Sequence, residues 1–296
     1  IFEVWYDGAN GGTGYYGGER GKRNIDARTY YDWPNTTKIV RELQPNACMF
    51  SDAGPDVRWV GNEQGTAGDP CWSTLNRDNY APGIADARQL NCGDRPGTHW
   101  LPAECDVSIR PGWFYHAGED AKVRTPQNIM DLYFASVGRG ASLLLNIPPD
   151  RRGLIHENDV KSLREFRRLL DAAFTKDLAQ GAKATADNVR GKAERFAAAN
   201  VLDGKRDTYW ATDDAITAPE LVLDLGKPVT FNIVRLREHL PLGQRIEEFS
   251  LDQFKDGQWA EFAKGTSIGN CRLVRGSAVT TDRVRLRIVK APACPA

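Results

Sequence analysis

The sequence lacks an excess of charge of either sign. Lysine and arginine together number 39, and aspartate and glutamate also number 39, so the formal net charge of the 296 residues is zero. Nucleic-acid-binding proteins usually carry a basic surplus, so this balance argues against that class. The longest apolar runs, such as 141–145 and 221–223, fall far short of the roughly 18 residues that a membrane helix needs. We therefore expect neither a nucleic-acid partner nor a membrane partner.

Signatures of metal and nucleotide binding are missing as well. The six cysteines contain no C-x-x-C pair, and together with the four histidines they show no zinc-binding spacing. There is no phosphate-binding loop, dinucleotide fingerprint or Ser–His–Asp pattern. An even number of cysteines is compatible with disulfides or with buried thiols. Of the six, we expect Cys271 and Cys294, which flank a strand-rich stretch, to form a bridge.

The patterns that are present indicate two domains, 1–178 and 179–296, as the chain length also favours. In the first, strand-like runs alternate with helical patterns, which predicts an α/β domain with a parallel sheet and helices outside it. Sites in such folds lie at the carboxyl ends of the strands. The expected strands are 1–6, 47–51 and 142–147, and the expected helices are 30–43, 126–136 and 157–173.

The sequence of the second domain predicts an all-β sandwich. Residues 179–199 are rich in alanine and lysine and form either a linker or a first strand. From about residue 200, short alternating runs follow one another at close spacing, with turns between them. We expect this domain to fold separately and to supply no catalytic group. Its expected strands are 220–225, 230–237, 249–254, 259–263 and 283–289.

The most informative segment for chemistry is 2–12, where an apolar strand ends in Asp7 and a glycine-rich loop follows. A carboxylate at the end of a barrel strand is typical of catalysis, although Asp-Gly also begins ordinary turns. Aromatic rings stack on sugar faces, and four of them surround Asp7 in the sequence. They are Trp5, Tyr6, Tyr15 and Tyr16.

Two further segments supply carboxylates. Residues 51–65 hold Glu63 on a loop between two glycines, which we expect to be mobile, and two aspartates, 52 and 56, that turn or cap roles would also explain. In residues 100–116, Glu104 and Asp106 are two positions apart on a strand and so share one face, with Arg110 as a counter-ion that would neutralise them. Carboxylates on separate strand-end loops among Trp and Tyr residues are what glycoside hydrolysis requires.

Four motifs make the chain resemble the α-L-fucosidases of glycoside hydrolase family 29, in particular the subgroup that acts on α-1,3/1,4-linked fucose. The motifs are VWYDGANGG (4–12), SDAGPDVRWVGNE (51–63), PAECDVSIRPGWFYH (102–116) and LLLNIPPDRRGL (143–154). The resemblance covers residues 1 to about 175, and these enzymes also carry a β-sandwich of this kind.

The resemblance implies a secreted or periplasmic retaining exo-glycosidase that removes terminal α-L-fucose from oligosaccharides or glycoconjugates and requires no cofactor. It makes Asp7 the nucleophile and Glu63 the acid/base, with Glu104 in reserve. It also implies a set of residues that bind the substrate. These are Trp5, Arg58, Trp59, Tyr15 and Trp113.

The family barrel has about three strands before the nucleophile strand that this sequence does not show. The resemblance therefore predicts the C-terminal part of a (β/α)8-like barrel, completed by an N-terminal polypeptide segment. The C-terminal part resembles discoidin-like, galactose-binding sandwiches, which often hold calcium, and Asp203 and Asp207 are its candidate ligands. Turn capping beneath a core Trp210 explains the same residues equally well. The alternative function is that of a non-catalytic carbohydrate-binding protein.

Overall fold

The computed structural model describes residues 1–6, 26, 28–80 and 86–296, so Asp7 and Tyr15 lie outside the described residues. The chain divides into two compact units. The first comprises residues 1–108 and 141–147, and the second comprises residues 109–140 and 148–296. The boundary predicted near residue 178 separates the two large sheets, but it falls within the second unit.

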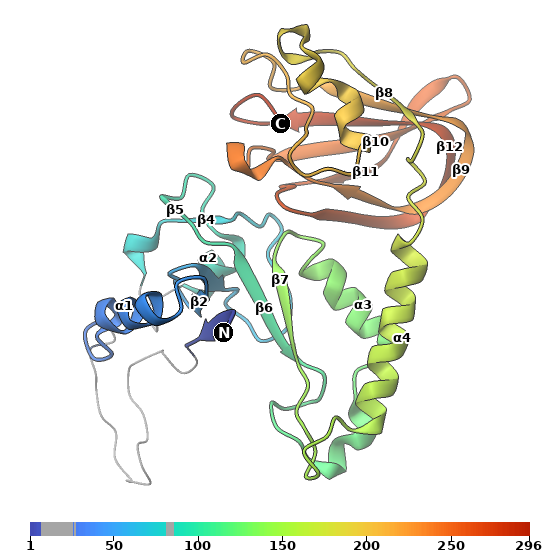
Figure 1. Ribbon diagram of the computed structural model, residues 1–296. Coiled ribbons are helices and arrows are strands. Elements are labelled where there is room, and N and C mark those ends of the chain that lie inside the picture. The colour runs from blue at the N-terminus through green and yellow to red at the C-terminus, as the bar shows by residue number, and fades with distance from the viewer. Residues whose placement is uncertain (7–25, 27, 81–85) are drawn as a thin grey trace. The chain divides into compact units, whose positions relative to one another are not determined.

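A five-stranded sheet forms the centre of the first unit (Figure 1). Its strand order is β1-β2-β3-β6-β7, and each neighbouring pair is parallel, as the strand–helix alternation predicts. The strands expected at 1–6, 47–51 and 142–147 are confirmed as β1, β2 and β7. The bounds of the sheet strands are β1 (Glu3–Trp5), β2 (Cys48–Ser51), β3 (Val57–Trp59), β6 (Ala103–Ser108) and β7 (Ser142–Asn146).

Local sequence signals set the helices of this unit. Helix α1 (Trp33–Leu43) has a proline in its first turn and ends just before Pro45. Helix α2 (Ala87–Cys92) begins at Asp86, whose side chain accepts hydrogen bonds from the N–H groups of Arg88 and Gln89. A short antiparallel ribbon of β4 (Thr74–Leu75) and β5 (His99–Trp100) lies in the chain between β3 and β6.

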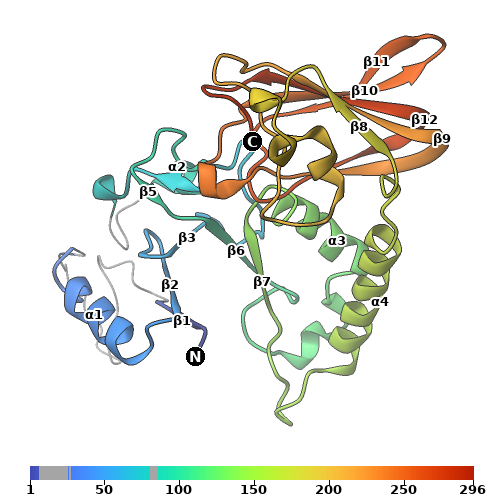
Figure 2. The same ribbon diagram turned by 45° about the horizontal axis from the view of Figure 1, so that its top comes forward.

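An antiparallel sheet with strand order β11-β10-β12-β9-β8 dominates the second unit (Figure 2). The all-β prediction for residues from about 200 is confirmed. Of the two alternatives for residues 179–199, a linker or a first strand, the structure shows a strand, β8. The bounds are β8 (Lys183–Ala186), β9 (Glu220–Leu236), β10 (Glu248–Lys255), β11 (Gln258–Gly265) and β12 (Arg272–Lys290).

Strand β9 is one continuous strand, where the sequence predicts two. Gly226 and Pro228 lie in its middle and resemble a turn, but Asp224 pairs with Arg283 on β12 and Val229 pairs with Thr281. Gly226 takes a φ of 74°, which lets the strand bulge at this point without ending.

Two helices of the second unit share an apolar core with its sheet. Helix α3 (Pro126–Ala135) and helix α4 (Glu157–Phe174) confirm the predicted helices, and they lie side by side in both views (Figures 1 and 2). Met130 and Phe134 on α3 pack with Cys271 and Leu273 at the start of β12. This core contains residues from both sides of the boundary predicted near residue 178, and separate folding of residues 179–296 stays a prediction.

The predicted Cys271–Cys294 disulfide is absent, and none of the six cysteines, all of which lie among the described residues, forms a disulfide. Cys271 is buried in the apolar core with Met130 and Phe134. The sulfur of Cys294 instead lies 3.4 Å from a guanidinium nitrogen of Arg245. Among the described residues, no helix has both the length and the apolar character required to cross a membrane.

Candidate active site

The parallel sheet of the first unit curls so that one face is concave. Trp5 on β1 donates a hydrogen bond from Nε1 to Oε1 of Glu104 on β6 at 2.9 Å. Three strand spacings separate β1 from β6, so a flat sheet would hold them about 14 Å apart. A direct hydrogen bond across that separation requires curvature, as in part of a barrel. The ring of Trp5 also stacks on Phe50 of β2, with centroids 4.1 Å apart.

Glu104 is enclosed on this concave face. It is buried, and its second carboxylate oxygen accepts a hydrogen bond from Oγ of Ser142 on β7 at 3.0 Å. The carboxyl of Glu3, on β1, lies beside it. Burial, together with the negative charge of Glu104, raises the pKa of Glu3. The reserve acid/base of the sequence analysis is thus fixed by donors from two strands.

Asp106 lies two residues further along β6, on the same face. Its Oδ1 accepts a hydrogen bond from Nε1 of Trp59 at 2.8 Å, and the residue is only 3% exposed. Burial raises the pKa of Asp106 to about 6, and the nearby carboxylates of Glu63 and Glu104 act in the same direction against the hydrogen bond from Trp59. A carboxyl that titrates near neutrality is common at functional sites.

Glu63 is exposed on the loop that follows β3. Side-chain amides of asparagine residues form hydrogen bonds that hold this loop in place. Asn62 accepts a hydrogen bond from the N–H of Gln64 at 3.0 Å and donates to the carbonyl of Thr66 at 2.9 Å. Asn91 on α2 donates to the same carbonyl at 3.0 Å. The glycines led us to expect a mobile loop, but the structure shows a loop that is hydrogen-bonded to α2.

Gly61 serves close packing on α2. Its φ is 82°, and a Cβ built there would lie 2.5 Å from the carbonyl oxygen of Ala87. Only glycine fits this approach, because any larger residue would meet main-chain atoms of α2. The glycine thus brings the base of the Glu63 loop against the helix.

Arg58 lies on the opposite face of the sheet from Trp59, because successive side chains of a strand alternate. It is completely buried, and its guanidinium donates to the carbonyl oxygens of Leu90 and Leu101. The structure therefore does not bring Arg58 together with Glu104 and Trp59, and its contacts are those of a residue that holds surrounding loops. A strand of only three residues shows too short an alternation for the sequence to tell which face Arg58 lies on. The pairing of β3 with its neighbours decides the face.

Asp56 also has structural contacts. Its carboxylate accepts a hydrogen bond from the N–H of Met49 at 2.9 Å and forms an ion pair with Arg41 at 2.6 Å. These contacts support the structural role that the sequence analysis offers for this residue.

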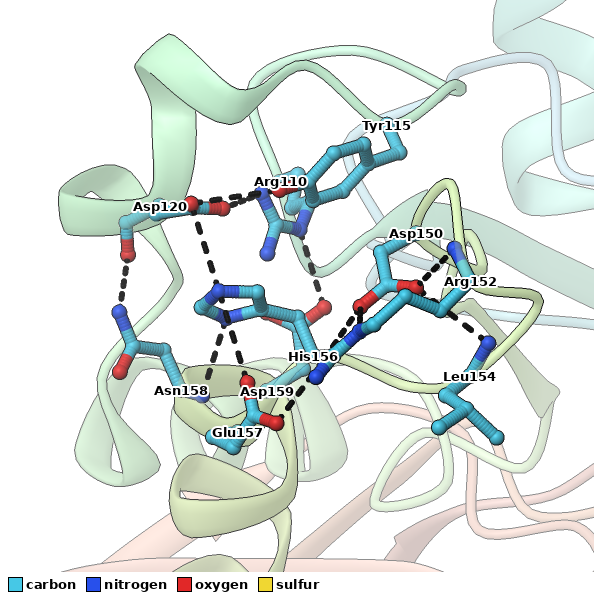
Figure 3. Close-up of polar contacts among 10 residues, drawn as sticks. All are labelled: Arg110, Tyr115, Asp120, Asp150, Arg152, Leu154, His156, Glu157, Asn158 and Asp159. Carbon is cyan, nitrogen blue, oxygen red and sulfur yellow. Dashed lines mark hydrogen bonds and ion pairs between the residues drawn. The ribbon is translucent and has the colours of Figure 1, made fainter.

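Arg110, suggested by the sequence as a counter-ion for Glu104 and Asp106, forms ion pairs within the second unit (Figure 3). Its guanidinium lies 3.0 Å from Asp159 on α4 and 2.9 Å from Asp120, and it stacks over the ring of Tyr115 at 4.7 Å. His156 accepts a hydrogen bond from the N–H of Asn158 and so caps α4. This network anchors the segment that contains the half-buried Trp113.

The two candidate calcium ligands lie on an exposed turn of the second unit. One oxygen of Asp203 accepts from the N–H of Lys205 at 2.9 Å, and the other accepts from Oγ1 of Thr208 at 2.6 Å. Asp207 is exposed, and Trp210 is buried beneath the turn. These contacts support the turn-capping alternative. Within the described ranges, no group of three His, Cys, Asp or Glu residues could hold a metal ion, and calcium stays a prediction.

The site residue that sequence reasoning did not assign is Asp106. Its spacing from Glu104 correctly places both on one face, but only the structure shows that Trp59 donates to it. The described part of the site therefore consists of Trp5, Trp59, Glu104 and Asp106 on the concave face, with Glu63 close enough to affect the titration of Asp106.

Two family models match different parts of the chain. A family model for alpha-L-fucosidase matches residues 4–173, and a model for a NedA-like, galactose-binding domain matches residues 200–286. Alpha-L-fucosidase 1 of Arabidopsis thaliana is 41% identical over 299 residues, which cover 100% of this chain and 56% of the relative. The chain spans about half the length of the curated relatives it matches.

Solved structures show the same likeness. A glycoside hydrolase 29 family member from an unknown rumen bacterium is 36% identical with a TM-score of 0.81, covering 100% of this chain and 49% of that one. A Ruminococcus gnavus GH29 fucosidase in complex with fucose is 30% identical with a TM-score of 0.84, covering 100% and 59%. The α/β partial barrel and the β-sandwich are thus the fold of these relatives, and the chain belongs to the alpha-L-fucosidase family.

Proposed function

We propose that this chain carries the catalytic carboxylates of a retaining exo-α-L-fucosidase that removes α-1,3/1,4-linked terminal fucose from oligosaccharides or glycoconjugates. The observation that supports this most directly is the concave sheet face, where Glu104 and Asp106 lie with Trp5 and Trp59 in a chain of the fucosidase family. Carboxylates beside aromatic rings suit glycoside hydrolysis. The Ruminococcus gnavus relative in complex with fucose supports fucose as the sugar.

In this proposal Asp7 attacks the anomeric carbon while Glu63 gives its proton to the departing glycosidic oxygen. The resulting fucosyl-enzyme ester is then hydrolysed by water, which loses a proton to Glu63 and releases Asp7, so the sugar configuration is retained. The role of Asp7 rests on the sequence alone. Glu104 is the reserve acid/base, but its hydrogen bonds from Trp5 and Ser142 favour a role in holding the site.

Leaving-group dependence tests the assignment of Glu63. Glu63→Ala should slow a natural fucosyl disaccharide far more than an aryl fucoside with an acidic phenol, because that phenol leaves without a proton. Asp7→Ala should lose nearly all turnover, and azide should restore part of it as fucosyl azide. Equal slowing of both substrates by Glu63→Ala would favour Glu104, and full activity of Asp7→Ala would refute the mechanism.

The alternative function is that of a non-catalytic carbohydrate-binding protein, and the match of residues 200–286 to a galactose-binding domain supports it.

We also propose that strands from outside this chain complete the barrel, since five parallel strands are described here and a closed barrel has eight. The chain can be assayed alone and joined to the remaining part of the Arabidopsis relative. Turnover of an aryl fucoside only by the joined protein supports completion, turnover by the chain alone contradicts it, and binding without turnover by both favours the alternative.

A further inference from the structure

The side chain of Asp106 links β6, which carries Glu104, to β3, which precedes the Glu63 loop. Trp59 is the last residue of β3, and three residues separate it from Glu63 in the chain. Its indole nitrogen donates to Asp106 on β6 at 2.8 Å, next to Glu104 on the same strand. The Glu63 loop therefore leaves the sheet from Trp59, whose side chain is hydrogen-bonded to Asp106.

The surroundings of Asp106 are unfavourable for a charge. The residue is 3% exposed, and the charged groups that face it among the described residues are two carboxylates, Glu63 from the loop after β3 and Glu104 from β6. The opposing residue on β7 is Leu144, which is apolar, and Glu3 on β1 lies beside Glu104. In the described part of the chain, no arginine or lysine forms an ion pair with Asp106.

A carboxyl in this place costs stability whenever it is ionised. Burial raises the pKa of Asp106 to about 6, above its ordinary value of 3.8. The unfolded chain therefore binds fewer protons than the folded one between these values, and the folded state loses stability as pH rises from about 4 to about 6. An asparagine would accept the same hydrogen bond from Trp59 without this cost. A buried carboxyl that carries such a cost points to a role for its charge.

We infer that Asp106 is a positioning residue of the proposed fucosidase site, whose ionised form holds the Trp59 indole and so fixes the start of the Glu63 loop. A charge-assisted hydrogen bond is about twice as strong as a neutral one, so protonation of Asp106 loosens Trp59. The site is then ordered for reaction above about pH 6 and loosened below it. This inference rests on the proposed function for its catalytic consequence, but its structural part can be measured without turnover.

The indole N–H resonance of Trp59 reports the structural part directly. In ¹⁵N-labelled protein, the signal that disappears in Trp59→Phe should shift with pH around a midpoint near 6. It should not titrate in Asp106→Asn. In Glu63→Gln its midpoint should move to lower pH, because one neighbouring negative charge is gone. A Trp59 signal that is independent of pH in the wild type, or that still titrates in Asp106→Asn, overturns the inference.

Stability and activity then separate a positioning role from a merely structural one. Asp106→Asn should raise the melting temperature at pH 7 and leave it unchanged at pH 4, while it lowers kcat/KM by about 10-fold or more and removes the acid limb near pH 6. Glu238→Gln changes another buried carboxyl, on the second unit, and should leave the pH profile unchanged. A lower melting temperature at pH 7 for Asp106→Asn, or an unchanged acid limb, contradicts the inference.

The two proposals fail in different ways. If neither the chain nor the joined protein hydrolyses a fucoside but the Trp59 resonance titrates as described, the proposed function is wrong and the positioning of Trp59 by Asp106 stands. If Asp106→Asn hydrolyses fucosides with an unchanged pH profile, the proposed function stands and the inference is overturned.

Discussion

The indole of Trp5 on β1 donates to the carboxylate of Glu104 on β6, across three strand spacings of the parallel sheet. The same hydrogen bond therefore couples the curvature of the sheet to the position of a site carboxylate. Because Ser142 on β7 supplies the second donor, three strands converge on this one side chain. Curvature and site geometry should consequently respond together when either donor is removed.

Trp5→Phe tests this coupling. Phenylalanine can still stack on Phe50 but cannot donate to Glu104, and a buried carboxylate that loses a donor costs about 2 kcal/mol. We expect a loss of about that size in the free energy of unfolding, measured by urea denaturation, together with reduced kcat on an aryl fucoside. Ser142→Ala removes the other donor and should cost a similar amount. If neither variant changes the unfolding midpoint, the hydrogen bonds do not support the site.

Much of the fold could be predicted because its signals are local. Apolar runs bounded by glycine and proline mark β1, β2 and β7, and the capping and proline signals mark α3 and α4. The two-residue spacing of Glu104 and Asp106 was enough to place both on one face. The four motifs that carry the resemblance also gave the family correctly.

The remainder depends on long-range register and packing, which local patterns do not contain. Trp5 and Glu104 are 99 residues apart, and the strand that contains Arg58 has only three residues, so its inward or outward direction follows from pairing alone. The glycines beside Glu63 are typical of a flexible loop, yet at position 61 α2 lies so close that a side chain would not fit. Asp106 likewise becomes a candidate only once Trp59 is seen to reach it.

Gly61→Ala tests whether packing on α2 sets the Glu63 loop. The left-handed backbone costs alanine about 1–2 kcal/mol, and its Cβ would also meet the carbonyl oxygen of Ala87. We expect a lower unfolding midpoint and a lower kcat, because Glu63 is displaced. Gly153→Ala is the matched control, since Gly153 also has a left-handed φ, of 75°, but nothing lies within 4 Å of a Cβ at that position. Equal behaviour of the two variants would show that the loop is not set by this contact.

The buried ion pair of Arg110 and Asp159 in Figure 3 should show strong coupling. Arg110→Met leaves Asp159 buried without this partner, which costs about 3–5 kcal/mol in comparable cases. Arg110→Met combined with Asp159→Leu removes both charges and should recover most of that loss. Urea denaturation of both single variants and the double variant measures the coupling energy. Additive losses would mean that the two side chains do not act as a pair.

Removal of residues 179–296 tests the shared core of the second unit. The truncated chain keeps α3 and α4 but loses the sheet that covers Met130 and Phe134, whose partners include Cys271 and Leu273. Each large apolar side chain that becomes exposed costs about 1.5–3 kcal/mol, so residues 1–178 should aggregate or bind a hydrophobic dye such as ANS. In the full chain, Leu273→Ala should lower the free energy of unfolding by about 2–5 kcal/mol through the same core. A monomeric fragment 1–178 that binds no dye, with a Leu273→Ala chain of unchanged stability, would show that the two segments fold independently after all.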